Sequence, residues 1–138
     1  MESVHRWAAE RGLRIEPYGV DLAPGLVAEA RRRLPHWADR IEVGNAIDYR
    51  PRDGRRSTFV HTLLDCVPAH RRGDLVRHAL EHLVEPGGRL LVSHYLAAGT
   101  VDRTAGQQLR DLGVAVGGEA GADGDRPPQT AWVDVPPR

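Results

Sequence analysis

Short apolar segments that alternate with helical patterns are the feature that most constrains the fold of this chain. The apolar segments have the length of strands and occupy residues 13–22, 41–44, 57–64 and 89–95. Pro17 lies inside the first segment, and because proline cannot donate to a ladder it indicates a strand start or an unpaired edge. Apolar segments of this length, separated by helices, favour a parallel sheet.

The helical patterns between these segments have clear limits. A first helix is expected at residues 2–11, and a second begins after Pro24, a residue suited to a first helical turn, and ends before Pro35. The strongest pattern, GDLVRHALEHLVEPGG, has one broad apolar face and is expected to end at the Pro-Gly-Gly triplet. The fold class predicted is α/β, a doubly wound, mostly parallel Rossmann-like sheet with helices on both faces.

The last third of the chain gives a weaker pattern. We expect a helix at residues 101–112, a strand at GVAVGG, a loop at residues 118–128 and a final strand at TAWVDV. Two strands joined by a loop suit an antiparallel hairpin at one edge of the sheet. Neither repeats nor a long linker divide the chain, so we predict a single domain over residues 1–138.

Composition excludes several function classes. Nineteen basic residues, all of them arginine, balance nineteen acidic ones, so no overall field attracts nucleic acid or an anionic membrane. The absence of lysine, with many Ala, Gly and Pro, is typical of a GC-rich genome and of a bacterial-type protein. A single cysteine, Cys66, excludes an internal disulfide. The lack of a leader and of a long apolar run predicts a soluble, cytoplasmic protein.

Polar residues follow two of the predicted strands. Asp21 stands at the end of the first, where a carboxylate can accept hydrogen bonds from both hydroxyls of a ribose. Asn45 follows the second on the same rim, where its amide would reach a purine amine while the backbone of Ala46 approaches the ring. A helix cap or a simple turn is the alternative at both positions, and the spacing does not decide between them.

One apparent metal motif carries less weight. His78, Glu81 and His82 match the H-x-x-E-H pattern of a zinc-peptidase class. They fall opposite the apolar face of their helix and no third ligand is evident, so we predict a solvated helix face and no metal site.

Several segments, in order, resemble class I S-adenosylmethionine-dependent methyltransferases. YGVDLAPGLVAEARRRLP resembles the second strand and following helix of that family, and RIEVGNAIDY its third strand and adenine-side loop. The long segment STFVHTLLDCVPAHRRGDLVRHALEHLVEPGGRLLVSHY resembles the fourth strand, helix, turn and fifth strand. The resemblance covers residues 14–95 well and the remainder loosely.

The resemblance implies a cofactor and its ligands. Asp21 would bind the ribose of S-adenosylmethionine, Leu22 would pack against the adenine, and Asn45 stands in place of the more usual aspartate near the adenine amine. Thr62 and Asp65 would lie near the methionine end or the substrate mouth, Thr62 as a cofactor contact and Asp65 as a substrate contact. The implied activity is methyl transfer to a small-molecule acceptor, a reaction that depends mainly on positioning, so no catalytic residue is predicted.

One departure from the family stands out. Its first strand and glycine-rich loop are absent, so the sheet is expected to be incomplete at its N-terminus, with two strands left without a neighbour. A start upstream, a truncated copy, or a neighbouring copy that covers the edges as a homo-oligomer would each account for this. A non-catalytic fragment or pseudoenzyme acting as a binding or assembly module is therefore the alternative function.

Overall fold

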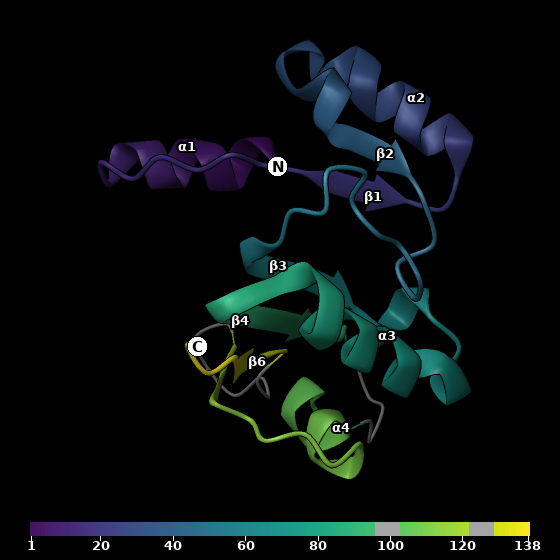
Figure 1. Ribbon diagram of the computed structural model, residues 1–138, viewed down its shortest axis with the longest axis vertical. Coiled ribbons are helices and arrows are strands. Elements are labelled where there is room, and N and C mark those ends of the chain that lie inside the picture. The colour runs from purple at the N-terminus through teal and green to yellow at the C-terminus, as the bar shows by residue number, and fades with distance from the viewer. Residues whose placement is uncertain (96–102, 122–128) are drawn as a thin grey trace. The chain divides into compact units, whose positions relative to one another are not determined.

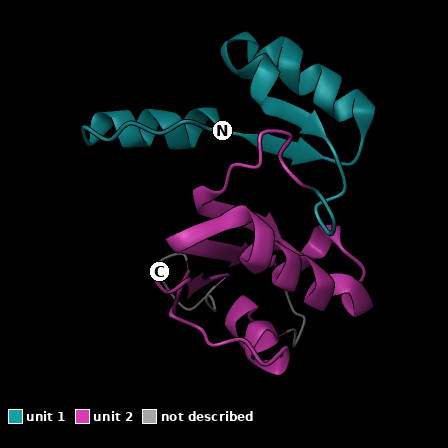
Figure 2. Cartoon of the chain, in the orientation of Figure 1, with its two compact units in different colours: residues 1–49 teal, residues 50–138 magenta. Residues whose placement is uncertain are grey.

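The computed structural model describes residues 1–95, 103–121 and 129–138. The chain divides into two compact units, residues 1–49 and 50–138 (Figure 2).

Unit 1 contains two helices and two short strands (Figure 1). The elements are α1 (Glu2–Glu10), β1 (Gly19–Asp21), α2 (Pro24–Arg33), a 3-10 segment (Pro35–Arg40) and β2 (Ile41–Val43). Gly12 follows α1 with a φ of 71°, a left-handed conformation that glycine adopts without strain. Pro24 begins α2, as predicted. β1 is shorter than the apolar segment at residues 13–22 and begins two residues after Pro17.

The two strands of unit 1 run parallel, with Gly19 opposite Ile41 and Asp21 opposite Val43. The α2 helix is fastened to β2 by Arg31, whose Nε and Nη2 donate to the Ile41 carbonyl oxygen at 2.8 and 2.6 Å. Val27 of α2 and Ile41 of β2 are buried. This small core holds the helix on the strand pair.

Unit 2 is built on a four-stranded sheet with the order β3-β4-β6-β5. Its strands are β3 (Ser57–Leu63), β4 (Val84–Ser93), β5 (Gly118–Ala120) and β6 (Thr130–Asp134). Short 3-10 turns (Leu64–Cys66 and Ala69–Arg71) lead from β3 into α3 (Arg72–His78), which continues as a π-helical segment (Ala79–Leu83), and α4 is Ala105–Asp111.

Strands and helices alternate along the chain and the pairs β1–β2 and β3–β4 are parallel, which confirms the predicted α/β fold class. β3 and β4 are parallel, whereas β4–β6 and β5–β6 are antiparallel, so β5 and β6 form the expected antiparallel edge hairpin. In the described part of the chain β1 pairs only with β2, and β3 only with β4. These are the two strands for which the family resemblance implied a missing neighbour.

The core of unit 2 lies between the sheet and its helices. The side chains of Leu90 and Val92, in the inner strand β4, are fully buried. They pack with apolar residues of α3, its π-helical continuation, α4 and β6, among which Val76, Ala79, Leu109, Ala131 and Val133 are also buried. Burial of large aliphatic side chains at this density is the main stabilising contribution to the unit.

The predicted end of the long helix is wrong. The long helix ends at Leu83, three residues before the proline, because the backbone has already turned to the extended conformation at Val84. Pro86 and Gly87 belong to a bulged start of β4, where the register with β3 shifts between Ser57 and Phe59. The bulge lets the chain pass from helix to strand without a separate loop.

The strand predicted at GVAVGG is also displaced, since β5 begins only at its last residue, Gly118. Val114 and Val116 pack against the core, and the segment meets β6 through the Gly117 amide, which donates to the Trp132 carbonyl at 2.8 Å. The alternating valines of this segment therefore reflect packing against the core, and the segment is not a strand paired in the sheet. Residues 101–102 of the predicted last helix and 122–128 of the predicted loop lie outside the described residues.

Candidate functional site

The rim of unit 1 brings together the two polar residues predicted after its strands. Asp21 ends β1, and Asn45 comes two residues after the end of β2. Because the strands are parallel and Asp21 is opposite Val43, both residues lie at the same, carboxyl edge. The Gly44 amide joins them, donating to the Asp21 carbonyl oxygen at 3.0 Å.

Asp21 forms a turn and still presents a carboxylate oxygen. Its Oδ1 accepts from the Ala23 amide at 2.8 Å, just before α2 begins. Within the part of the chain that the structure describes, this is the only hydrogen bond to the side chain, and Asp21 is exposed. The turn and ribose-binding interpretations are thus compatible, since each uses a different oxygen.

The neighbours of Asp21 add an apolar surface and an amide. Leu22, directly after Asp21, is 68% exposed. The Asn45 Oδ1 accepts from the Ile47 amide at 3.2 Å, and the residue is exposed. Ala46 is half-buried beside it.

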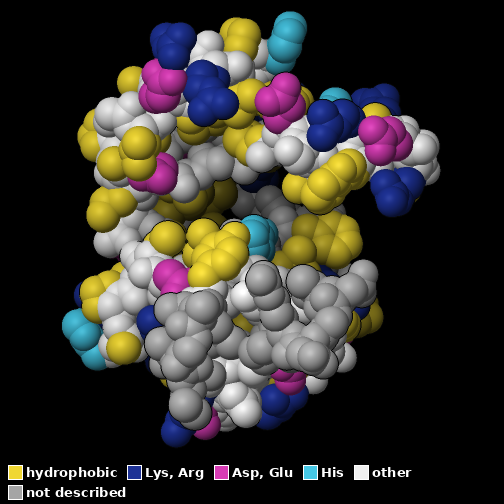
Figure 3. Space-filling model, turned by 180° about the vertical axis from the view of Figure 1, so that it is seen from behind, with side chains coloured by type: hydrophobic (Ala, Val, Ile, Leu, Met, Phe, Trp, Pro, Cys, Tyr) yellow, Lys and Arg dark blue, Asp and Glu magenta, His cyan; other side chains and the backbone are white. Residues whose placement is uncertain are grey.

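Several other apolar side chains reach the surface of the molecule. Figure 3 shows them in yellow among charged groups. In unit 1 the most exposed of the large ones besides Leu22 are Leu13, Leu26, Val4 and Trp7. Exposure alone therefore does not mark Leu22 as a ligand contact; its position directly after Asp21 is the basis for proposing one.

The carboxyl edge of unit 2 carries a second polar group. Asp65 follows β3 in a 3-10 turn, and His94 follows β4 directly. The parallel register, with Leu63 opposite Ser93, places both at the same edge of the sheet. Thr62 lies one step earlier, half-buried in β3 opposite Val92.

Asp65 and His94 form a close acid–imidazole pair. The His94 Nδ1 lies 2.8 Å from the Asp65 Oδ1, and the His94 side chain is only 8% exposed. The contact has the length of a hydrogen bond without its angle, so within the described residues Nδ1 remains a buried nitrogen without a hydrogen-bond partner. The other oxygen, Oδ2, accepts from the Tyr95 amide at 2.9 Å and so fixes the carboxylate. Buried polar atoms without a hydrogen-bond partner are rare in folded proteins.

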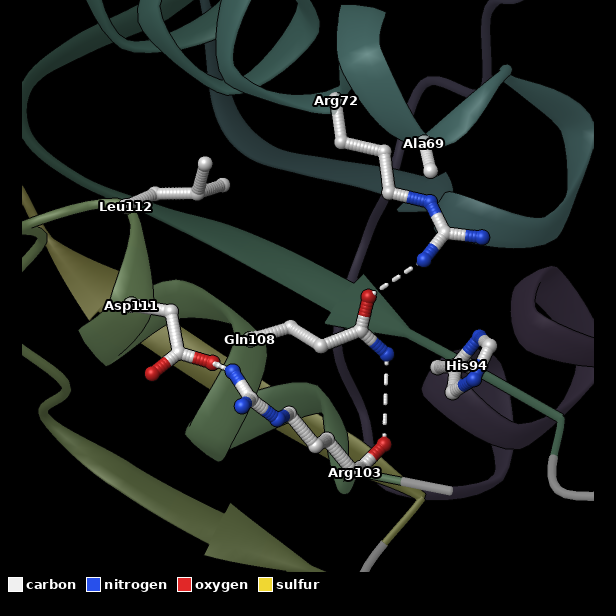
Figure 4. Close-up of a pocket in the computed structure, with 7 residues that line it drawn as sticks. All are labelled: Ala69, Arg72, His94, Arg103, Gln108, Asp111 and Leu112. Atoms are coloured by element: carbon white, nitrogen blue, oxygen red, sulfur yellow. Dashed lines mark hydrogen bonds and ion pairs between the residues drawn. The ribbon is translucent and has the colours of Figure 1, made fainter. Parts of the chain in front are cut away.

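His94 also lines a pocket of about 460 Å³ within unit 2 (Figure 4). Gln108 lies at its centre between two arginines: Arg72 Nη1 donates to the Gln108 Oε1 at 2.6 Å, and Gln108 Nε2 donates to the Arg103 carbonyl at 3.2 Å. Ala69 and Leu112 supply apolar wall, and Asp111 is ion-paired with Arg103. The pocket therefore combines an imidazole, two guanidinium groups and apolar surface.

The sequence interpretation included Asp65 but missed His94. A signal for it was present, because His94 is the first residue after a buried strand, and side chains at that position of an α/β sheet line its binding edge. The histidines of the H-x-x-E-H pattern lie elsewhere. His82 Nε2 is 3.0 Å from Arg50 Nη2, and among the described residues no cluster of metal-ligating side chains is present.

Comparison with known proteins adds a fold assignment. No family model and no curated protein sequence matches the chain. Among solved structures, that of Streptomyces venezuelae DesVI is 26% identical over 72% of this chain, with a TM-score of 0.52. An O-methyltransferase family protein from Burkholderia thailandensis is 19% identical over 97%, with a TM-score of 0.64. The glycopeptide N-methyltransferase MtfA, complexed with S-adenosylmethionine, is 16% identical over 98%, with a TM-score of 0.63.

The lengths of these proteins differ from that of this chain. It spans 40% of the DesVI chain and 47% of the Burkholderia protein, but 93% of the MtfA chain. In the described residues no helix has the length and apolar character needed to cross a membrane. Sheet topology, the order of elements and the solved structures agree, and this chain has the fold of the class I S-adenosylmethionine-dependent methyltransferases.

Proposed function

We propose that the chain binds S-adenosylmethionine and transfers its methyl group to a small-molecule acceptor. The observation that carries the proposal is the rim of unit 1, where an exposed carboxylate ends one parallel strand and an exposed amide follows the next. In open α/β sheets, ligands bind at this edge, and an acidic residue there binds ribose hydroxyls.

The residues of this rim fit the adenosine part of the cofactor. Asp21 keeps one oxygen for a ribose diol while the other holds its turn. The exposed Leu22 offers an apolar surface for a purine ring, and Asn45 offers N–H groups and an oxygen for its edge. The half-buried Ala46 would contact the ring through its backbone.

The residues proposed for the reacting end belong to unit 2. Their role rests on the resemblance, which assigns Thr62 to the cofactor and Asp65 to the substrate. The contact between Asp65 and His94 supports a substrate role, because a fixed carboxylate beside a buried imidazole is a means of accepting a proton. When bound, S-adenosylmethionine would supply an electrophilic methyl group; the chain would hold and orient the reactants.

Calorimetric titration tests the proposal. The purified chain is titrated with S-adenosylmethionine and with its demethylated product, and we expect both to bind. Asp21→Asn keeps an oxygen for the Ala23 amide but removes the charge, so the turn survives and the hydrogen bonds to the ribose weaken. The expected loss of affinity is about tenfold to a hundredfold.

The matched control is Asp39→Asn, since Asp39 is also exposed in unit 1 but lies in the 3-10 segment away from the carboxyl ends of the strands. Its affinity should equal that of the wild type. If Asp21→Asn bound S-adenosylmethionine as tightly as Asp39→Asn and the wild type do, Asp21 would not belong to the ribose site. Absence of binding at about 1 mM ligand, a limit of about −4 kcal/mol, would favour the alternative of a non-catalytic binding module.

A further inference from the structure

The pocket of unit 2 is lined by one arginine, Arg72, whose positive charge is not neutralised by the described residues around it. Arg72 donates from Nε to the Leu64 carbonyl at 3.2 Å and from Nη1 to the Gln108 side-chain oxygen, and both acceptors are uncharged. Within the described residues Nη2 has no hydrogen-bond partner. Arg103, by contrast, is neutralised by its ion pair with Asp111. The lining thus has two guanidinium groups but one carboxylate, and Arg72 carries the excess charge.

The imidazole in the same pocket is arranged to accept a proton. A carboxylate can only accept, so Asp65 beside Nδ1 favours the tautomer with the proton on that nitrogen. The lone pair then resides on Nε2, at the other side of the ring. The same carboxylate, 2.8 Å from Nδ1, lies beside the ring that takes the proton.

The size and the walls of the pocket limit what it can accept. A volume of about 460 Å³ is in the range of sites for small molecules. Ala69 and Leu112 provide apolar surface for a carbon skeleton, while the Nη2 group of Arg72 offers charged N–H donors that suit a carboxylate.

We propose that this pocket is the acceptor site, and that it takes a small molecule bearing both a carboxylate and an ionisable hydroxyl. Arg72 binds the carboxylate. His94 removes the hydroxyl proton: the O–H bond breaks, its electron pair stays on the oxygen, and a new N–H bond forms at Nε2. The inference rests on the proposed methyl transfer, for which the resulting oxyanion is the nucleophile. Asp65 acts as a positioning residue through His94.

An optical titration tests this without any cofactor. The probe is 4-hydroxy-3-nitrobenzoate, whose nitrophenol changes its absorbance on ionisation, and the comparison ligand is 4-hydroxy-3-nitrobenzamide, which lacks only the carboxylate charge. At a pH where the free probe is protonated, binding to the wild type should raise the phenolate absorbance. The benzoate should bind about tenfold more tightly than the amide, the effect of one charge-assisted contact.

Two variants separate the two roles. Arg72→Gln should abolish the preference for the benzoate, and His94→Asn should abolish the rise in phenolate absorbance. The matched controls, Arg77→Gln on the exposed side of α3 and His70→Asn in the preceding turn, should behave as the wild type. Equal binding of the two ligands to the wild type, or an unchanged absorbance rise in His94→Asn, would overturn the proposal.

Arg72 also holds Leu64 and Gln108, so its variant risks misfolding. An NMR titration of the wild type avoids this: the benzoate should shift the ring resonances of His94 and leave those of His70 in place. Unshifted His94 resonances would contradict the site. Asp65→Asn should change the ring nitrogen shifts of His94, which report its tautomer, and a merely structural Asp65 would leave them as they are.

The failure of this proposal is distinguishable from that of the proposed function. The optical titration contains no S-adenosylmethionine, and the calorimetric titration contains no acceptor. Binding of the cofactor without the nitrobenzoate response would refute the acceptor site alone. The nitrobenzoate response without cofactor binding would support the pocket and refute methyl transfer.

Discussion

Single residues at the strand ends combine structural and chemical duties in this chain. Asp21 closes a turn with one oxygen and presents the other, and Asp65 holds the Tyr95 amide with one oxygen and approaches His94 with the other. A carboxylate has two oxygens and about four lone pairs, so one local contact does not exhaust it. Residues of this kind cannot be assigned to a turn or to a site by position alone.

A second histidine makes a prediction at the residue scale. His61 of β3 hydrogen-bonds through Nε2 to the Ser93 hydroxyl at 2.9 Å, and Ser93 in turn contacts the Thr130 hydroxyl at 2.8 Å. Partial burial lowers the pKa of His61 below its usual value, because desolvation disfavours the imidazolium. The folded protein therefore binds this proton less readily than the unfolded chain does.

The consequence is a loss of stability in acid. The contribution of His61 is fully present above the unfolded-state pKa of about 6.5 and is lost as the pH falls through the lower folded-state pKa. Denaturant unfolding at pH values from about 7, just above the unfolded-state pKa, down to about 5 should show a smaller fall in unfolding free energy for His61→Gln than for the wild type. Parallel pH profiles would contradict this. Burial also lowers the pKa of His82, so the substitution removes only part of the slope.

At the scale of the element, the start of β4 depends on a close approach of backbones. A Cβ built on Gly88 would lie 2.7 Å from the Thr58 carbonyl oxygen and 2.9 Å from that of Glu85. Gly87 beside it has a φ of 81°. The bulge that joins helix to strand therefore requires these glycines for geometric reasons.

A pair of glycine substitutions tests this. Gly88→Ala forces the β3 and β4 backbones apart and should lower the unfolding free energy by about 1–3 kcal/mol. Gly25→Ala, in the first turn of α2, meets nothing within 4 Å and should be neutral or stabilising by up to about 1 kcal/mol. Chemical denaturation measures both, and a tolerated Gly88→Ala would show that the bulge relaxes freely.

At the scale of the whole molecule, the two units differ in how their strands are supported. β4 is paired on both sides, by β3 and β6, and its Leu90 and Val92 are fully buried. β1 and β2 form a sheet of only two strands over a small core. A two-stranded sheet is marginal without further packing.

Hydrogen exchange should reveal this difference. We expect the amides of Leu90–Val92 to be the best protected of the chain, and those of Gly19–Asp21 to exchange at least about tenfold faster, because local opening of the smaller unit costs less. Saturating S-adenosylmethionine should slow exchange in β1 if Asp21 binds it. Equal protection of both strands in the absence of ligand would contradict the prediction.

Local signals in the sequence accounted for most of the elements and for part of the candidate site. Pro24 and Gly12 marked helix limits because proline lacks a backbone donor and glycine tolerates positive φ. Asp21 and Asn45 were identified as neighbours because parallel strands share one carboxyl edge. Their roles toward a nucleoside remain predictions.

Only the tertiary structure decided what depends on contacts between distant segments. The register of β3 with β4 brings Asp65 to His94, and the shared core under α3 and α4 brings Arg72 to Gln108. Neither contact has a periodic signature, since each is set by the alignment of whole elements. Sequence alone therefore determined the α/β class and the polar strand ends, because these follow from local periodicity and chain direction. The acid–imidazole pair, the pocket and the bulged entry to β4 were decided by packing.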